Sequence, residues 1–258
     1  MPNDVMNIIT LYGEAEEIAE LKKEYGMEDR HVALLDFNKV IPMPDGLNIE
    51  AGSETDHGIW LYLMAANPYD SWPEAEAWGY EKLSPEAYVP LKARFPDGSE
   101  NRYQRERAEA IRNDGEGNQK ERVKRMLALG KQAAENMLHY GATTWYAWCI
   151  AHWGTKWNAY GGAEFDRQQS NQFRFLTAWS PPEPVIQKLS QLYPALLLKH
   201  QWADENIGWN LGERIYHNGE IKQEEFFVGG SQEAIQYAEA LFGWGEPEQS
   251  ERLDLQIE

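Results

Sequence analysis

One short stretch of the chain gathers side chains that could hold a ligand. The segment WYAWCIAHWGTKWNAY (145–160) contains four of the eleven tryptophans and the single cysteine. Its second half interleaves flat aromatic rings with a cation and an amide, a combination that can bind planar or charged ligands. The candidate ligand-binding residues are Trp153, Lys156, Trp157, Asn158 and Tyr160.

The first half of the same segment has the spacing of a helix. Trp145, Trp148, Cys149 and Trp153 recur at three- and four-residue spacing, which puts them on one face of a helix that Gly154 can end. Aromatic residues at this spacing are more typical of a hydrophobic core than of a binding platform. We therefore expect the three tryptophans to be buried and Cys149 to serve as a small apolar residue.

Sequence signatures of known catalytic and metal sites are missing. The chain has no phosphate-binding or dinucleotide-binding glycine loop, no H-E-x-x-H and no C-x-x-C. The six histidines lack metal-ligand spacing, and one cysteine cannot hold an iron–sulfur cluster. We predict no catalytic residue, no metal and no cofactor. An enzyme with an unrecognised active site stays open as an alternative, because 42 acidic residues could include a pair of catalytic carboxylates.

Charge is distributed unevenly along the chain. The formal net charge is −18, which argues against a protein held on nucleic acid by many phosphate contacts. Residues 1–90 carry 5 basic and 18 acidic side chains and residues 203–258 carry 3 and 13, whereas the residues between them are net positive. We expect the acidic ends to face a basic host protein. The candidate protein-binding residues are Glu220, Glu224, Glu225 and Glu233.

Hydrophobic periodicity and turn residues predict an α+β fold. The apolar runs and the Asn218-Gly219 turn signal indicate one antiparallel or mixed sheet with helices on one face and a split βαβ core. The predicted strands are 7–12, 34–41, 172–178, 196–202, 209–217 and 220–227. The predicted helices of this core are 14–25, 182–193 and 231–242.

The middle of the chain differs from its ends in composition. Five prolines are spread over residues 68–96, a density that favours short helices and loops over strands, and a longer helix is predicted at about 119–139. We therefore expect a ferredoxin-like core at 1–46 and 141–244, a mainly helical insertion at 47–140 packed on that core, and a flexible acidic tail at 245–258. No apolar run is long enough for a membrane span, and the expected location is cytoplasmic.

Several motifs together resemble a known family. They are PN near the start, DFNKVIPMP (36–44), TWYAWCIAHWGTKWNAY (144–160), TAWSPPEPVIQKLSQLYP (177–194) and ADENIGWNLG (203–212). In this order they resemble the YubB ferredoxin-like family found in bacteriophages and conjugative plasmids. The resemblance implies a ferredoxin-like topology and, for a phage-encoded chain, the host cytoplasm. It implies no iron–sulfur cluster and supplies no catalytic residues.

Three classes of function follow from these observations. The first is a non-enzymatic accessory or regulatory protein of a mobile element, which binds a host protein through acidic surfaces as an inhibitor or a nucleic-acid mimic. The second is the enzyme with an unrecognised site. The third is a single-stranded nucleic-acid binder that uses residues 145–160 for stacking and the basic residues of 102–131 for the backbone.

Overall fold

The computed structural model describes residues 3–27, 34–96, 98–114, 120–161 and 170–244. It divides into two compact units. Met1–Pro42 with Cys149–Glu258 forms the first, called here the sheet unit, and Met43–Trp148 forms the second, called the helical unit. The predicted insertion 47–140 falls within the helical unit, and the predicted tail 245–258 lies outside the described residues.

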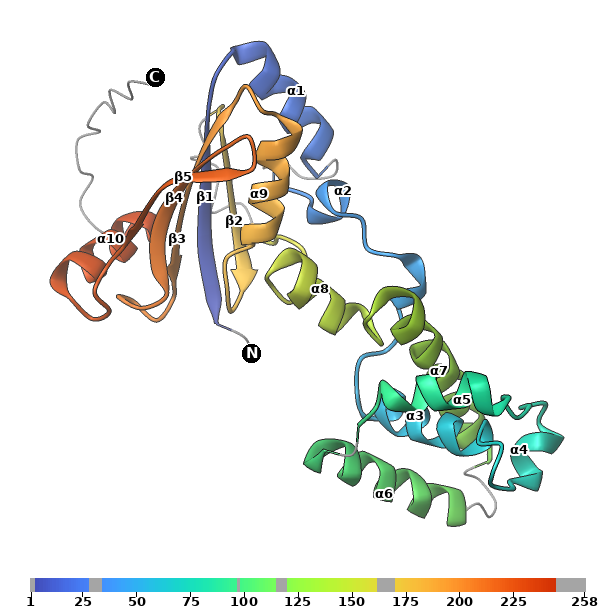
Figure 1. Ribbon diagram of the computed structural model, residues 1–258. Helices are drawn as coiled ribbons and strands as arrows, with labels where there is room; N and C mark the ends of the chain where they lie inside the picture. Colours follow the sequence, from blue (N-terminus) through green and yellow to red (C-terminus); the bar gives the residue numbers. More distant parts are fainter. Residues whose placement is uncertain (1–2, 28–33, 97, 115–119, 162–169, 245–258) are drawn as a thin grey trace. The chain divides into compact units, whose positions relative to one another are not determined.

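The sheet unit is built on five antiparallel strands in the order β2-β1-β3-β4-β5 (Figure 1). The strands are β1 Asp4–Tyr12, β2 Gln172–Ala178, β3 Leu197–Asp204, β4 Leu211–His217 and β5 Glu220–Phe226. The turn between β4 and β5 has positive φ at both Asn218 and Gly219, as that residue pair predicts. The α+β class and the antiparallel sheet are thereby confirmed.

A split βαβ arrangement lies at the centre of this sheet. Strand β1 pairs antiparallel with β2 on one side and β3 on the other, so that Asn7 has both Phe175 and Trp202 as register partners. Strands β2 and β3 are consequently parallel to each other, and α9 (Glu183–Leu192) connects them across β1. Most of β1 is buried on both faces, which explains why its apolar residues do not alternate strictly with polar ones.

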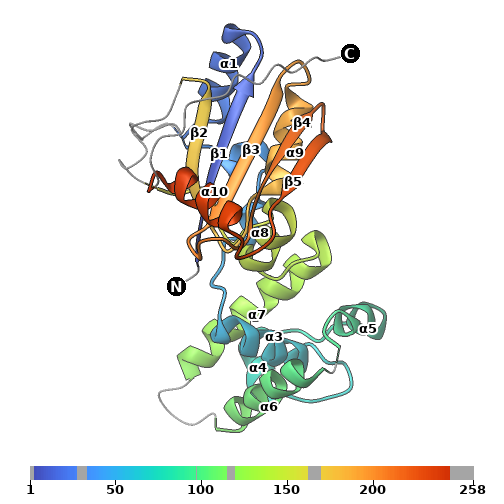
Figure 2. The same cartoon turned by 90° about the vertical axis from the view of Figure 1, so that its left-hand side faces the viewer.

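Helices cover both faces of the sheet, whereas the sequence placed them on one. Arg214, on the face that includes His200, forms an ion pair with Glu183 of α9. Arg174, on the other face beside Ile8, donates to the Leu241 carbonyl of α10 (Gln232–Phe242). Figures 1 and 2 show α10 across the sheet from α9. A strand buried on both faces needs cover on both, and the apolar stripe of α10 supplies the second layer.

The predicted strand 34–41 is wrong. Residues Phe37–Val40 form a single helical turn, α2, and only Leu35 makes a β-bridge, to Gly26 at the end of α1 (Ala15–Tyr25). The Asp36 side chain accepts a hydrogen bond from the Asn38 backbone N–H at 3.0 Å and so caps the turn. A local cap therefore outweighs the β-forming tendency of the apolar run.

The helical unit has its core between α3 and α7. Its elements are η1 Asp45–Leu47, α3 Ser53–Ala65, α4 Pro73–Ala77, α5 Pro85–Ala93, α6 Ser99–Asn113 and α7 Lys120–Tyr140, and α8 Trp145–Trp153 begins in this unit. The backbones of α3 and α7 touch at Gly58 and Gly130, where a β-carbon on Gly130 would lie 1.9 Å from the Gly58 carbonyl oxygen. Only glycine permits this approach.

A buried amide fixes the ends of the helical unit. Asn136 on α7 donates from Nδ2 to the carbonyl oxygens of Gly46 at 2.7 Å and Thr143 at 3.0 Å. Its Oδ1 accepts from Gln132 at 3.1 Å. The side chain is 1% exposed, and these partners satisfy its amide. The segments before α3 and after α7 are thus tied to one point on α7.

Candidate functional site

Trp153 and Asn158, two of the five candidate ligand residues, are structural. The Trp153 indole is buried, donates to the Ile41 carbonyl at 2.9 Å and packs edge-to-face on Phe37. Asn158 accepts from the Phe37 N–H at 2.9 Å and donates to Asp36 Oδ1 at 2.8 Å. Both side chains therefore hold the α2 turn in place.

The other three candidates are half-buried and form one cluster around the ammonium group of Lys156. They are Lys156 itself, Trp157 and Tyr160. Lys156 Nζ is 4.5 Å from the Trp157 ring centroid and 4.9 Å from that of Trp179, so the ammonium lies between two indoles. The Tyr160 ring packs edge-to-face on Trp157, and its hydroxyl donates to Asp4. Burial, and then this hydrogen bond, raise the pKa of Tyr160. The Lys156 ammonium, which the sequence predicted to bind a ligand, thus already contacts tryptophan rings of the same chain.

Sequence reasoning missed Trp179 in this cluster. Its φ of 70° places a bulky residue in the left-handed region, and the side chain is 44% exposed. Its carbonyl accepts from Asn210 Nδ2 at 3.0 Å, and Asn210 also has positive φ. The partners of Trp179, Asn210 and Lys156, lie in other segments of the chain, so no local sequence pattern identifies this cluster.

The predicted acidic residues lie on an exposed strand and helix of the sheet unit. Glu220, Glu224 and Glu225 belong to β5, all seven residues of which are exposed, and Glu233 is exposed at the start of α10. Glu224 pairs with Arg214 at 3.2 Å. Strand β5 is an edge of the sheet, since β4 is its one neighbour in the strand order.

Residues 153–243 match the profile of the ferredoxin-like domain in Api92-like protein. The Api92-like match begins at the end of α8 and runs through β2 to α10, so it covers four of the five strands and leaves out the helical unit. A crystal structure of a protein Api92 from Yersinia pseudotuberculosis aligns with 90% of this chain and 100% of its own length, at 13% identity and a TM-score of 0.37. No curated protein matches the chain.

The helical unit contains an open groove of about 610 Å³ outside the Api92-like match. Trp72 and Trp78 flank α4 and form part of its wall, with ring centroids 6.2 Å apart. Arg112 lies over Trp72 at 5.1 Å, while Lys120 and Lys124 lie 5.9 and 5.8 Å from the Trp78 ring centroid. Aromatic and cationic side chains from positions about forty residues apart thus meet in one groove.

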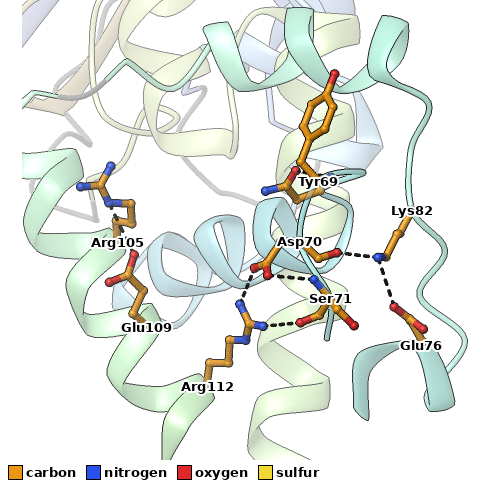
Figure 3. A network of polar contacts seen from close by, with 9 residues as sticks. Tyr69, Asp70, Ser71, Glu76, Lys82, Arg105, Glu109 and Arg112 are labelled. Atoms are coloured by element: carbon orange, nitrogen blue, oxygen red, sulfur yellow. Dashed lines mark hydrogen bonds and ion pairs between the residues drawn. The ribbon is translucent and has the colours of Figure 1, made fainter. Parts of the chain in front are cut away.

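Hydrogen bonds hold the Arg112 side chain in place in this groove. It donates to Asp70 Oδ2 at 2.8 Å and to the Ser71 carbonyl at 2.6 Å (Figure 3). The hydrogen bond from Arg112, with one from the Ser71 N–H, lowers the pKa of Asp70. Lys82 donates to the Asp70 carbonyl and pairs with Glu76 at 3.5 Å. The loop that carries Trp72 is therefore anchored from α6 and from the segment after α4.

Two buried groups of the sheet unit titrate far from their ordinary range. Burial raises the pKa of the Cys149 thiol to about 12, so it stays protonated at neutral pH and does not suit a nucleophile. Burial, with the nearby Arg214 charge, lowers the pKa of His200 to about 3. Its Nε2 donates to Asn7 Oδ1 at 3.0 Å, and Asn7 in turn donates to Thr177 at 2.8 Å. His200 is thus a neutral core residue.

The described residues contain neither a metal-ligand cluster nor a helix suited to a membrane. No three His, Cys, Asp or Glu side chains there are grouped so that they could hold a metal ion. Within the same ranges, none of the helices combines the length and the apolar character that a membrane crossing requires.

Proposed function

We propose that this chain is a non-enzymatic accessory protein that binds an extended basic segment of a host protein along β5. The observation that carries the proposal is the edge strand itself, which is exposed over its whole length and bears Glu220, Glu224 and Glu225. An edge strand presents unpaired backbone N–H and C=O groups that can pair with a strand from another chain. A role in a phage or plasmid is part of the proposal and comes from the YubB resemblance.

The charge on this edge selects the partner. Two copies of β5 would bring like charges together, which disfavours pairing of the protein with itself. A strand that carries Lys or Arg would instead meet opposite charges, so the same residues favour one partner and exclude another. Exposed Ile221 and Phe226, 44% and 56% exposed, add apolar surface at the two ends of the strand.

Overall charge supports the same partner. The sheet unit has 12 basic and 25 acidic residues, a formal net charge of −13, whereas the helical unit has 12 and 17, a net charge of −5. The acidic N-terminal region of residues 1–90 is divided between the two units. The field that attracts a basic partner belongs mainly to the sheet unit, and salt will screen it.

The test is a matched pair of charge reversals. One variant changes Glu220, Glu224, Glu225 and Glu233 to Lys, and the control changes Glu14, Glu16, Glu20 and Glu106, also exposed, to Lys. Both variants have the same net charge. Binding of a labelled peptide of alternating Lys and Val is measured by fluorescence anisotropy at low and physiological salt.

We expect the variant with reversed charges on β5 and at Glu233 of α10 to lose at least ~10-fold in affinity and the control to lose less, because three of its reversed charges lie on the edge strand itself. Equal losses of affinity in the two variants would mean that binding depends on net charge alone, and this would contradict a site on β5. A wild-type protein that does not bind the peptide would contradict the proposal as a whole.

A further inference from the structure

We propose that the groove of the helical unit binds a nucleotide unit, with its base against Trp78 and its phosphate on Lys120 and Lys124. The groove lies between α4, the end of α6 and the start of α7. The proposal uses no residue of the sheet unit and does not depend on the function of β5. It differs from the nucleic-acid hypothesis drawn from the sequence, because the aromatic partners of the basic helices are Trp72 and Trp78 and not residues 145–160.

The apolar wall of the groove suits a flat ring. Trp72 is 5% exposed and locked by its contact with Arg112, so it forms a rigid floor. Trp78 is half-buried, ends α4 and lines the groove, so part of its side chain is accessible to a ligand. Pro73 and Ala77 complete the wall without filling it.

The cationic side chains of the groove differ in how strongly they are already paired with other groups of the chain. Arg112 is committed to Asp70 and Ser71, so it positions the wall and adds little net charge. Lys124 pairs with Glu121 at 3.1 Å, an exposed i,i+3 pair of small energy. Lys120 is exposed, and among the described residues no carboxylate lies within ion-pair distance of its ammonium. Lys120, helped by Lys124, is the group able to take an anion.

A nucleotide can contact the aromatic wall and the lysines of this groove at the same time. Its base can stack on an indole, and its phosphate can reach an ammonium that lies within 6 Å of the same ring. The Asn113 amide at the rim offers a donor and an acceptor to the base edge. An acidic peptide would satisfy the lysines and leave the indoles uncovered. Glu74, also in the lining, would repel a run of phosphates, which limits the ligand to one or a few units.

The site volume agrees with a ligand of this size. Small-molecule sites generally occupy about 300–1,000 Å³, and the groove measures about 610 Å³. The shared chemistry is a base with a phosphate, whether it comes as a free mononucleotide or as part of a single strand. Isothermal titration of the full chain with adenosine monophosphate and with a six-nucleotide single-stranded DNA distinguishes the two sources.

Variants assign any binding to the groove. In Lys120→Gln/Lys124→Gln we expect affinity for the tighter ligand to fall at least ~10-fold, because the phosphate loses its partners. Trp78→Leu keeps an apolar side chain, and we expect it to weaken binding at least ~5-fold through loss of stacking. The matched control is Lys131→Gln/Lys188→Gln, which removes the same charge away from the groove, and circular dichroism checks that each variant is folded.

Three outcomes would overturn the proposal. One is no heat of binding with either nucleotide probe. Another is an equal loss in the control variant, which would make the effect one of net charge. The third is binding of inorganic phosphate or of a Glu-rich peptide as tight as that of adenosine monophosphate, since the base would then contribute nothing.

Discussion

The two units of this chain are stabilised by different kinds of contact. In the sheet unit the contacts are distant in sequence: Asn7 on β1 bonds to Thr177 and to His200. The helical unit is contiguous along the chain, and its principal contact is two helices that touch at Gly58 and Gly130. One chain thus combines a unit that depends on long-range pairing with a unit that depends on small residues at a single helix crossing.

The largest expected effect tests the aromatic core of the sheet unit. Trp153→Ala should lower the free energy of unfolding of that unit by about 3–5 kcal/mol, because it removes a buried ring and leaves the Ile41 carbonyl without its donor. Trp145, at the other end of α8, belongs to the helical unit and is only half-buried, although the sequence predicted a buried side chain. Trp145→Ala should therefore cost that unit clearly less. Hydrogen exchange followed by mass spectrometry measures each unit separately. Equal effects of the two substitutions would contradict this assignment.

A somewhat smaller effect is expected at the helix crossing of the helical unit. Gly130→Ala should cost about 3 kcal/mol, because the new methyl group meets the backbone of α3 and no rotamer change can relieve the clash. Protection against exchange should fall in α3 and α7 and persist in β1 and β3. Gly98→Ala is the control, since no atom lies within 4 Å of its added β-carbon. Loss of protection in both units would show that they are not energetically separate.

The smallest effect concerns pH and the sheet unit alone. The folded-state pKa of His200, about 3, lies below the unfolded value of about 6.5, so the unfolded chain binds a proton that the folded chain refuses. The stability contribution is complete above pH 6.5 and declines as the pH falls toward 3, by about 2 kcal/mol at pH 5. Denaturation curves of wild type and His200→Gln at pH 7 and pH 5 measure it. The variant should lose less stability between the two, and an identical loss would contradict the buried neutral imidazole.

The sequence predicted those elements whose signals are local. The Asn218-Gly219 turn needs two residues with positive φ, and the apolar stripes of α7 and α9 have helical spacing. The strand at 34–41 failed because Asp36 caps a helical turn inside an apolar run. The face of the sheet that α10 covers could not be predicted. The sequence of a strand such as β1 can indicate that both faces of the sheet are buried, but it does not indicate which helix covers each face.

The candidate sites show the same limit more strongly. Lys156 and Trp157 were predicted as ligand-binding residues, and the structure adds Trp179, from a loop more than twenty residues away, to their cluster. The groove residues Trp72, Trp78 and Lys120 belong to separate elements that no spacing rule connects. The charge run around residues 102–131 signalled an exposed basic surface, but not which aromatic side chains would lie beside it.

The central place of β1 has a consequence for how the chain is made. Of the five strands of this sheet it is the first to be synthesised, while β2 begins at Gln172, 160 residues after β1 ends at Tyr12. At about 5–20 residues per second, synthesis of the intervening segment takes about 8–32 seconds. For that time the most apolar strand of the sheet has neither of its partners. The contiguous helical unit can fold during the same interval, so the nascent chain exposes an aggregation-prone strand beside a finished neighbour, and a chaperone that recognises short apolar segments would act on residues 4–12.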